Sequence, residues 1–370
     1  MAEPLVSAVS FQRLRIRCLR NLASVDFEPG PALNLIFGDN GQGKTSVLEA
    51  LYLVATSRSF RAERLAELIS EGEASSTISA DIVESGLMRE QRAVVGKKER
   101  SFLLAGKKPS SLAEFAVQTP VVVFHPGDLS LVAGAATVRR RLLRRVALYA
   151  SPRSAEDRVR LAYAARSRQR VLQTRGIHAP ELDALEAVMA RHGVRYGAAL
   201  ASAAKDLIGA LKGAFERLSA PELSFDACHR CGGSLDEAEY QKALAGRRAL
   251  DTERRSQTFG PSRDELVLEI LGRSARKHAS QGQQRILALG LKLAELECVR
   301  SLRNKNPVLL LDDVSSELDP ARTLAVYEFL SASQSQIFLT TTRRELFATP
   351  GSSHHERSEW RVQAGQIERV

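Results

Sequence analysis

The sequence has few cysteines, a single tryptophan and no long apolar run. Among its 370 residues are only four cysteines, Cys18, Cys228, Cys231 and Cys298, too few and too scattered for a disulfide framework. No apolar run approaches the roughly 20 residues that span a bilayer, and the first residues lack the basic and apolar regions of a signal peptide. We therefore expect a cytoplasmic protein with no membrane partner, and the scarce cysteines fit a reducing compartment.

The one close pair of cysteines lies in the segment Cys228-His229-Arg230-Cys231. This segment could contribute zinc ligands, but no second pair of Cys or His stands at zinc-finger spacing. The sequence therefore does not predict a metal site there.

Basic residues exceed acidic ones, and the excess is concentrated in one stretch. The chain has a formal net charge of +10. Between Arg139 and Arg175 there are twelve arginines, no lysine and two acids, so this stretch alone carries the same excess. Clustered guanidinium groups suit phosphate binding, although a solvated helix face is the alternative interpretation. We take the first arginines, Arg139, Arg140, Arg141, Arg144 and Arg145, as candidate DNA contacts.

A phosphate-binding loop occurs early in the chain. Residues 38–45 read GDNGQGKT, which fits the GxxxxGK[ST] pattern, between an apolar run at 32–37 and a helical pattern at 45–54. Glycines let backbone N–H groups surround a phosphate, and the helix N-terminus adds partial positive charge. The predicted ATP-binding residues here are Gly38, Asp39, Asn40, Gly41, Gln42, Gly43, Lys44 and Thr45. Lys44 would reach the β and γ phosphates, and the Thr45 hydroxyl would ligate Mg²⁺.

A second nucleotide-site motif follows late in the chain. Four apolar residues, 308–311, precede Asp312 and Asp313, which is the Walker B form in which a buried strand delivers an acid to its carboxyl end. We expect Asp312 to hold Mg²⁺ through water. Asp313 and Lys44 are the predicted catalytic residues, and because the Asp313 side chain is short, we expect slow hydrolysis.

The hydrophobic pattern predicts an α/β fold that is divided in sequence. Residues 1–130 and 256–370 carry strand patterns and the nucleotide motifs, and we assign them to one ATPase head with a mixed sheet and flanking helices. Residues 131–255 are rich in Arg, Ala and Leu and predict a mainly helical inserted lobe. Sustained heptads are absent there, so a compact lobe is favoured over a long coiled coil.

Two further segments resemble motifs of the ABC-type ATPases. Ser280, Gln281, Gly282 and Gln283 open a predicted helix and resemble the signature motif of that superfamily, and Ser316-Glu317-Leu318-Asp319 resembles its D-loop. A serine that caps a helix is the commoner explanation of such a segment, but its place between Walker A and Walker B favours the signature. The resemblance implies that the signature of one protomer docks on ATP bound by the other, which would make a dimer depend on ATP.

Several longer stretches resemble the RecF family of bacterial recombination mediators. The matching segments span most of the chain and are Arg20-Asn21, Ser59-Phe60-Arg61, residues 122–129 (VVFHPGDL), residues 258–264 (TFGPSRD) and residues 280–285 (SQGQQR). The chain departs from the family pattern at Ser262, where a histidine is usual, and at Arg144, where an acid is usual.

This resemblance implies an ATP- and Mg²⁺-dependent DNA-binding protein of recombinational repair. It would dimerise on ATP, bind gapped, single-stranded or duplex DNA, and assist RecA loading with RecO and RecR, supporting replication and SOS induction. Its ATPase would be slow and stimulated by DNA. Two alternatives remain, an ATP-gated scaffold that does not act on DNA and a transporter-like ATPase subunit. Thr342 counts against the transporter, because a switch histidine is usual there.

Overall fold

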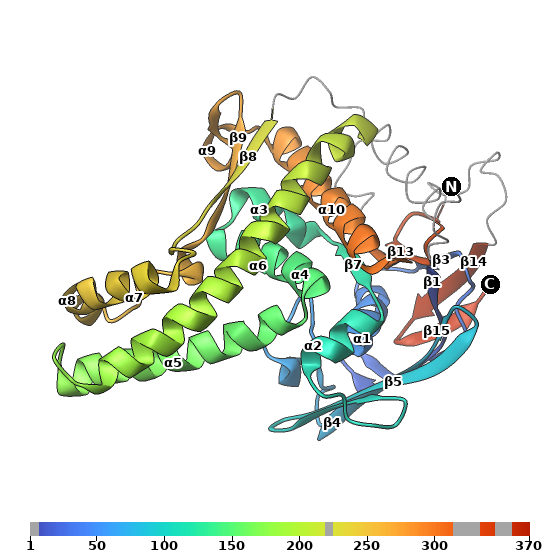
Figure 1. Cartoon of the computed structure of the whole chain (residues 1–370). Coiled ribbons are helices and arrows are strands. Elements are labelled where there is room, and N and C mark those ends of the chain that lie inside the picture. Colours follow the sequence, from blue (N-terminus) through green and yellow to red (C-terminus); the bar gives the residue numbers. More distant parts are fainter. Residues whose placement is uncertain (1–6, 219–224, 314–333, 345–356) are drawn as a thin grey trace. The chain divides into compact units, whose positions relative to one another are not determined.

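The computed structural model describes residues 7–218, 225–313, 334–344 and 357–370. The chain divides into two compact units. Unit 1 comprises Met1–Asp128, Phe215–Ala220 and Val299–Val370, and unit 2 comprises Leu129–Ala214 and Pro221–Cys298. Both ends of the chain contribute strands to unit 1, and the blue strand β3 and the red strand β14 pair side by side (Figure 1).

The first sheet of unit 1 positions the nucleotide motifs. Its strands are β3 (Leu33–Phe37), β7 (Val121–Phe124), β12 (Val308–Asp312), β13 (Ile337–Thr341), β14 (Arg357–Gln363) and β15 (Gln366–Arg369), in the order β15-β14-β3-β13-β12-β7. All neighbours pair in parallel except β14 and β15. Every residue of β7, β12 and β13 is buried, as expected of parallel strands covered on both faces. The loop after β3 and the acids after β12 therefore lie at the same edge of the sheet.

The second sheet of unit 1 is mostly antiparallel. Its strands are β1 (Ser7–Leu19), β2 (Leu22–Phe27), β4 (Ser75–Glu84), β5 (Leu87–Gly96), β6 (Arg100–Leu104) and β11 (Lys305–Asn306). They run in the order β11-β1-β4-β5-β6, with β2 paired to β1. Polar and apolar residues alternate along β4, so one face packs on the core and the other does not.

Helix α1 (Lys44–Thr56) joins the two sheets of unit 1. It contacts β1, β4 and β5 of the second sheet and β7, β12 and β13 of the first. All its residues except Thr45 are buried, which is typical of a helix that packs on every side. The helix that follows the phosphate-binding loop is thus held rigidly inside the core. The short elements η1 (Leu65–Leu68), α2 (Leu112–Gln118) and η2 (Pro126–Leu129) complete this part of the chain.

Unit 2 is largely helical. Its helices are α3 (Ser130–Ala133), α4 (Ala136–Ala150), α5 (Arg153–Arg175), α6 (Glu181–Arg217), α7 (Glu237–Gly246), α8 (Arg248–Glu253), η3 (Pro261–Arg263), α9 (Ala275–His278) and α10 (Gln281–Arg303). Helices α5 and α6 begin directly after Pro152 and Pro180, the breaks that the sequence indicates. A small antiparallel sheet of β8 (Phe225–Arg230), β9 (Glu265–Ile270) and β10 (Arg273–Ser274) accompanies them.

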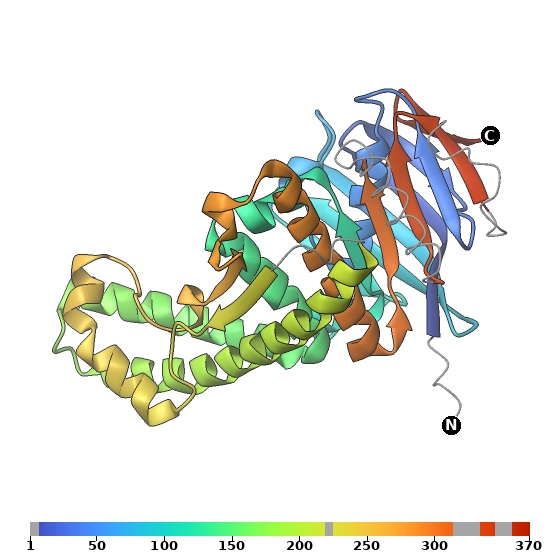
Figure 2. The ribbon, with the colours of Figure 1, turned by 90° about the horizontal axis from the view of Figure 1, so that it is seen from above.

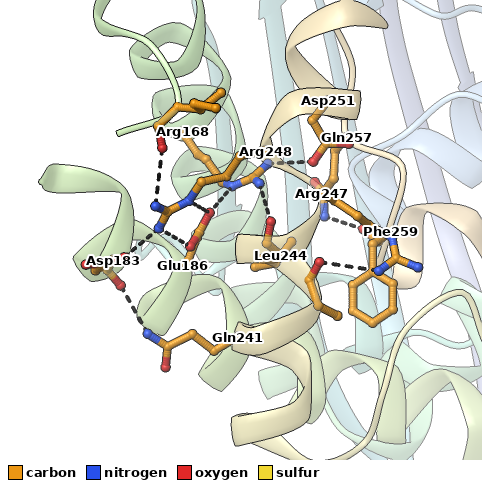
Figure 3. Close-up of polar contacts among 12 residues, drawn as sticks. Arg168, Asp183, Glu186, Gln241, Leu244, Arg247, Arg248, Asp251, Gln257 and Phe259 are labelled. Atoms are coloured by element: carbon orange, nitrogen blue, oxygen red, sulfur yellow. Dashed lines mark hydrogen bonds and ion pairs between the residues drawn. The ribbon is translucent and has the colours of Figure 1, made fainter. Parts of the chain in front are cut away.

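Buried charges connect α5, α6 and α8. Figure 2 shows α5 and α6 lying side by side, and Figure 3 shows the charged network between them and α8. Arg168, with a side chain only 1% exposed, donates to Glu186 at 2.8 Å, to Asp251 at 2.7 Å and to the Leu244 carbonyl at 2.8 Å. Arg248 also pairs with Glu186. Because each of the three guanidinium nitrogens of Arg168 donates a hydrogen bond, the charge is tolerated in the core and holds the three helices in one arrangement.

Unit 2 extends further along the chain than the helical lobe expected at 131–255. Strand β8 pairs with β9, so residues 225–230 bring the segment 265–270 into unit 2. The segment that contains Ser280 therefore belongs to unit 2 by contacts, although the sequence pattern groups it with the head. Hydrophobic periodicity cannot reveal such long-range pairing, because it reports only local structure.

Candidate nucleotide site

The loop between β3 and α1 has a backbone that only glycine adopts readily. Gly38 and Gly43 have φ of 152° and 118°. A Cβ at Gly38 would lie 2.2 Å from the Val362 carbonyl oxygen, and one at Gly43 would lie 2.8 Å from a methyl group of Leu22. The glycines of the motif are therefore required by the local packing as well as by the need to expose backbone N–H groups.

Two neighbouring turns hold this loop in place. The Asn21 amide donates to the Gly41 carbonyl at 3.0 Å, and its oxygen accepts from the Ser46 hydroxyl at 3.0 Å. The side-chain oxygen of Gln42 accepts from the Ala364 N–H at 2.6 Å. Gln42, predicted to contact ATP, thus uses its side chain to anchor the loop, whereas Asp39, Asn40 and Gly41 stand exposed at its tip.

Lys44 lies inside the loop. Its Nζ donates to the carbonyl of Gly38 at 2.7 Å and to that of Asp39 at 2.8 Å. Burial lowers the pKa of Lys44, while the nearby acids Asp313 and Asp312 act in the opposite direction. An ammonium group held by carbonyls at the mouth of α1 is placed to attract a phosphate oxygen.

The Walker B acid lies directly beside the loop. The Thr45 hydroxyl donates to Asp312 Oδ1 at 2.8 Å, and the Thr340 hydroxyl donates to the same oxygen at 2.9 Å. A hydroxyl and a carboxylate in contact are hard oxygen donors of the kind that Mg²⁺ prefers. The structure thus brings together the two residues, 267 positions apart in sequence, that were predicted to hold Mg²⁺.

Asp313 follows in an unusual backbone conformation. Its φ is 49°, in the left-handed region, and its N–H donates to the Thr340 hydroxyl at 3.1 Å. Thr340 therefore connects both acids, since the same hydroxyl donates to Asp312. No local sequence pattern marks Thr340, whose role becomes visible only when β12 and β13 pair.

A cluster of charged and polar side chains contacts α1 at Glu49. Glu49 of α1 is fully buried and accepts from Arg20 Nε at 3.0 Å and from the Ser59 hydroxyl. Two segments that resemble the RecF family thus meet at one helix, namely Arg20-Asn21 and Ser59-Phe60-Arg61. Arg20 orients the helix and Asn21 orients the loop.

The signature-like segment forms the N-terminus of α10. The Ser280 hydroxyl accepts from the Gln283 N–H at 3.2 Å, and the Gln283 side chain accepts from the Ser280 N–H at 2.8 Å. This reciprocal pair is a capping box, so the helix-capping interpretation applies. Ser280, Gln281 and Gly282 are exposed, and this leaves the end of α10 open to a ligand or a second chain.

Other predicted positions are less informative. The D-loop segment Ser316–Asp319 lies outside the described residues. Thr342, at the position where a switch histidine is usual in transporter ATPases, is exposed after β13.

The arginines of α4 are mostly engaged in holding unit 2 together. Arg139 is 6% exposed, pairs with Glu265 at 2.7 Å and donates to the carbonyls of Leu131 and Gly134. Arg145 pairs with Glu295, whose side chain is 2% exposed. Arg140 donates to the Asp264 carbonyl at 2.8 Å.

These contacts show that the five arginines predicted to contact DNA differ in their surroundings. Arg139 and Arg145 neutralise acids on β9 and α10. Arg140 donates to a backbone carbonyl, Arg144 is half-buried and Arg141 is exposed. The sequence does not reveal the two ion pairs, because the acids lie far along the chain, at sequence separations of 126 and 150 residues.

The Cys228–Cys231 segment forms part of the small sheet of unit 2. His229 Nε2 lies 3.1 Å from Asp264 Oδ2, and Asp264 also accepts from the Gly232 N–H at 2.8 Å. Within the described ranges, no group of three or more His, Cys, Asp or Glu could hold a metal ion. None of the described helices is long and apolar enough to cross a membrane.

Known proteins are similar to this chain over most of its length. Residues 10–354 match the family described as RecF/RecN/SMC N terminal domain. The DNA replication and repair protein RecF of Anaeromyxobacter sp. (strain Fw109-5) is 38% identical over 343 residues, covering 90% of this chain and 92% of that one. RecF of Myxococcus xanthus (strain DK1622) is 35% identical over 340 residues, covering 89% and 90%.

Solved structures share the fold. A structure of the recombination mediator protein RecF-ATP in the RecFOR pathway superposes with a TM-score of 0.87 at 24% identity, covering 98% of each chain. An Smc head domain from Pyrococcus furiosus gives a TM-score of 0.54 at 15% identity, covering 98% of this chain and 96% of that one. The predicted α/β fold with an ABC-type ATPase head is thereby confirmed, and the match of the family model and relatives over most of the sequence shows that this chain belongs to the RecF family of DNA replication and repair proteins.

Proposed function

We propose that this chain is an ATP-dependent DNA-binding protein of recombinational repair, in which ATP acts as a switch. The observation that carries the proposal is the contact between Thr45 and Asp312, which joins the phosphate-binding loop to the Walker B acid. The similarity to RecF proteins supports the DNA part, and the ATP-bound state of a related structure supports the choice of nucleotide.

The chain's own residues have separate tasks at the nucleotide. The backbone of the loop and Lys44 would bind phosphate oxygens, while Thr45 and Asp312 would hold Mg²⁺, which would neutralise phosphate charge. Asp313 orients the attacking water. Because its carboxylate is one methylene shorter than glutamate and its backbone is fixed at Thr340, turnover is slow without DNA.

Dimerisation follows from the exposed end of α10. The N-terminus of a helix carries partial positive charge and free N–H groups, and Ser280 adds a hydroxyl. Docked on nucleotide bound by a second copy, this segment makes ATP part of the interface. Each head-to-tail dimer then holds two nucleotides, and hydrolysis releases it.

DNA contact is assigned to exposed arginines that have no acidic partner. Arg166 and Arg170 of α5 are exposed and make no ion pair in the part of the chain that the structure describes. Tyr163 lies one turn earlier, 67% exposed. At this spacing the three side chains share a helix face, on which the arginines can contact phosphates and the ring can stack on an unpaired base. Arg141 of α4 is exposed as well, but it also interacts within the protein, so it does not belong to this group. With RecR and RecO as partners, such binding assists RecA loading at gaps and so supports replication and SOS induction.

Sedimentation of the wild type and of Lys44→Met tests the switch. We expect the wild type, but not Lys44→Met, to dimerise with Mg-ATP and then to bind a gapped DNA duplex tightly. A wild type that dimerises with ATP but ignores DNA would favour the ATP-gated scaffold. One that stays monomeric would overturn the proposal.

The DNA assignment has its own test. Arg166→Gln with Arg170→Gln removes two candidate phosphate contacts and should lower the slope of log affinity against log salt by about 1.5 to 2. Arg139→Gln is the comparison, since it removes a charge of the same kind from a buried ion pair. An unchanged slope in the double variant would exclude this face of α5.

A further inference from the structure

The edge of the antiparallel sheet in unit 1 presents unpaired backbone groups. Strand β6 is the last strand of that sheet and pairs along its length with β5, while Leu104, at its end, also pairs with Lys107 of the following turn. The Ala105 N–H donates to the Glu90 carbonyl at one end of this pair, and the Gly96 N–H donates to Glu99 at the other. Because hydrogen-bonded and non-bonded positions alternate in an antiparallel ladder, the N–H and C=O groups of Arg100 and Phe102 point away from β5.

A groove runs beside this edge. Its volume is about 680 Å³, and it lies between the end of the β4-β5-β6 sheet and the segment that leads into α2. Phe102 and Val94 contribute apolar surface on the strand side, and Pro109 and Leu112 contribute it on the other side. Leu112 is 40% exposed, so part of this apolar lining faces solvent.

Basic side chains surround the groove. Arg100 and Lys108 line it, and Lys97, Lys98 and Lys107 lie in the turns directly before and after β6. All five are exposed, and no ion pair engages them within residues 7–218 or the other described ranges. Among the described residues that line the groove, Glu99 is the one acid. The surroundings of the groove therefore favour a negatively charged occupant.

We propose that the edge of β6 binds an extended acidic peptide segment of a partner protein, which adds to the sheet as a further strand. Main-chain hydrogen bonds to Arg100 and Phe102 supply affinity, and the apolar lining receives alternate side chains of the peptide. The basic turns select acidic residues on the other positions. This partner site uses none of the residues of the nucleotide site or of the proposed DNA contacts on α5.

The free backbone edge favours a peptide over a nucleic acid. A phosphate backbone can meet the five cations, but it cannot continue the ladder of a β-strand. A peptide strand uses both features, and its period of two places acidic and apolar side chains on opposite faces.

Binding of a synthetic peptide to the full chain tests this site. The probe is a fluorescent octapeptide of alternating aspartate and valine, compared with the same sequence N-methylated at every second residue. We expect the unmodified peptide to bind at least tenfold more tightly, because N-methylation removes the ladder donors and leaves the charge unchanged. We also expect slower hydrogen exchange of the Arg100 and Phe102 amides on binding, whereas the Leu104 amide already donates to Lys107.

Charge variants complete the experiment. Arg100→Glu and Lys108→Glu should each weaken binding about tenfold, whereas Lys205→Glu on α6 makes the same kind of change at an exposed site elsewhere and should have little effect. Lys44→Met should bind the peptide normally, so that failure here is distinguishable from failure of the ATP switch. Equal binding of both peptides would overturn the proposal in favour of a general anion-binding surface. Tighter binding of an oligonucleotide, abolished by the same variants, would overturn it in favour of a DNA-binding surface. If none of the probes binds, the proposal is overturned, and the lysines serve only to prevent the edge of β6 from pairing with another chain.

Discussion

Replacing Arg168 by methionine should destabilise unit 2 by about 3 kcal/mol. The substitution removes the positive charge that Glu186 and Asp251 share in a site where all three side chains are at most 1% exposed. Breaking a buried ion pair by deleting one partner costs about 3–5 kcal/mol, because the remaining charges lose their compensation.

The contacts that remain place the effect at the lower end of that range. Glu186 keeps Arg248, which donates to it at 3.0 and 2.6 Å. Asp251 keeps the N–H and hydroxyl of Thr258, at 2.9 and 2.7 Å. The carboxylates are therefore not left entirely without partners, and a loss near 3 kcal/mol is expected.

Arg160→Met is a matched control on the same helix. Arg160 pairs with Glu156 at the surface, where the side chains are 58% and 61% exposed, and such a pair contributes about 0.5 kcal/mol or less. Arginine and methionine have similar helix propensity, so the two variants differ mainly in the burial of the lost charge.

Urea unfolding followed by two probes measures the difference. The single tryptophan, Trp360, is buried in unit 1, whereas the helix signal in circular dichroism comes largely from unit 2. If the free energy of unfolding falls by about 2 kcal/mol per molar urea, Arg168→Met should lower the urea midpoint of the circular dichroism transition by about 1.5 M. A shift no larger than that of Arg160→Met would refute the reasoning that the buried network holds α5, α6 and α8 together.

Three further predictions concern pH, the loop and the metal. Burial acts to raise the pKa of Glu295, but the positive charges of Arg145 and Lys292 outweigh this effect and lower the pKa to about 2. The ionised carboxylate therefore adds about 3 kcal/mol to the free energy of unfolding above pH 4.5, and this contribution is lost as the pH falls toward 2. The stability of Glu295→Gln, measured as urea midpoints between pH 5 and 2.5, should therefore fall less steeply than that of the wild type, and parallel curves would contradict the assignment. Gly38→Ala should abolish nucleotide binding and lower the melting temperature strongly, because its Cβ would meet a backbone carbonyl at 2.2 Å. Gly41→Ala, whose Cβ would have no described atom within 4 Å, should lower the free energy of unfolding by only about 1 kcal/mol. Equal melting temperatures of the two variants would contradict this account of the packing. In calorimetry, Asp312→Asn should weaken ATP binding at least tenfold with Mg²⁺ and little in EDTA, and a loss that is the same under both conditions would show that Asp312 does not act through the metal.

The nucleotide motifs illustrate what a sequence reveals well. The glycine spacing of the loop and the apolar run before Asp312 are local patterns, and each predicts one element and its end. That both elements are parallel strands of one sheet then follows from general rules of α/β folds. The contact of Thr45 with Asp312 was therefore predictable. The role of Thr340 was not, because the pattern does not specify the pairing of β12 with β13. The role of Asn21 was not either, because its partners Gly41 and Ser46 lie 20 and 25 residues further along the chain, in the loop and in α1.

The arginines show where prediction from sequence ends. By itself the sequence determined the strands, the helices, the phosphate-binding loop and the excess of positive charge, because these depend on residue type and local spacing. Only the tertiary structure decided which charges are paired inside the protein and which remain for a partner. Arg139 and Arg145 are neutralised by acids on distant elements, while Arg166 and the basic turns beside β6 are not. Since a charge acts through its nearest neighbours in space, its role is set when the chain folds and those neighbours come together.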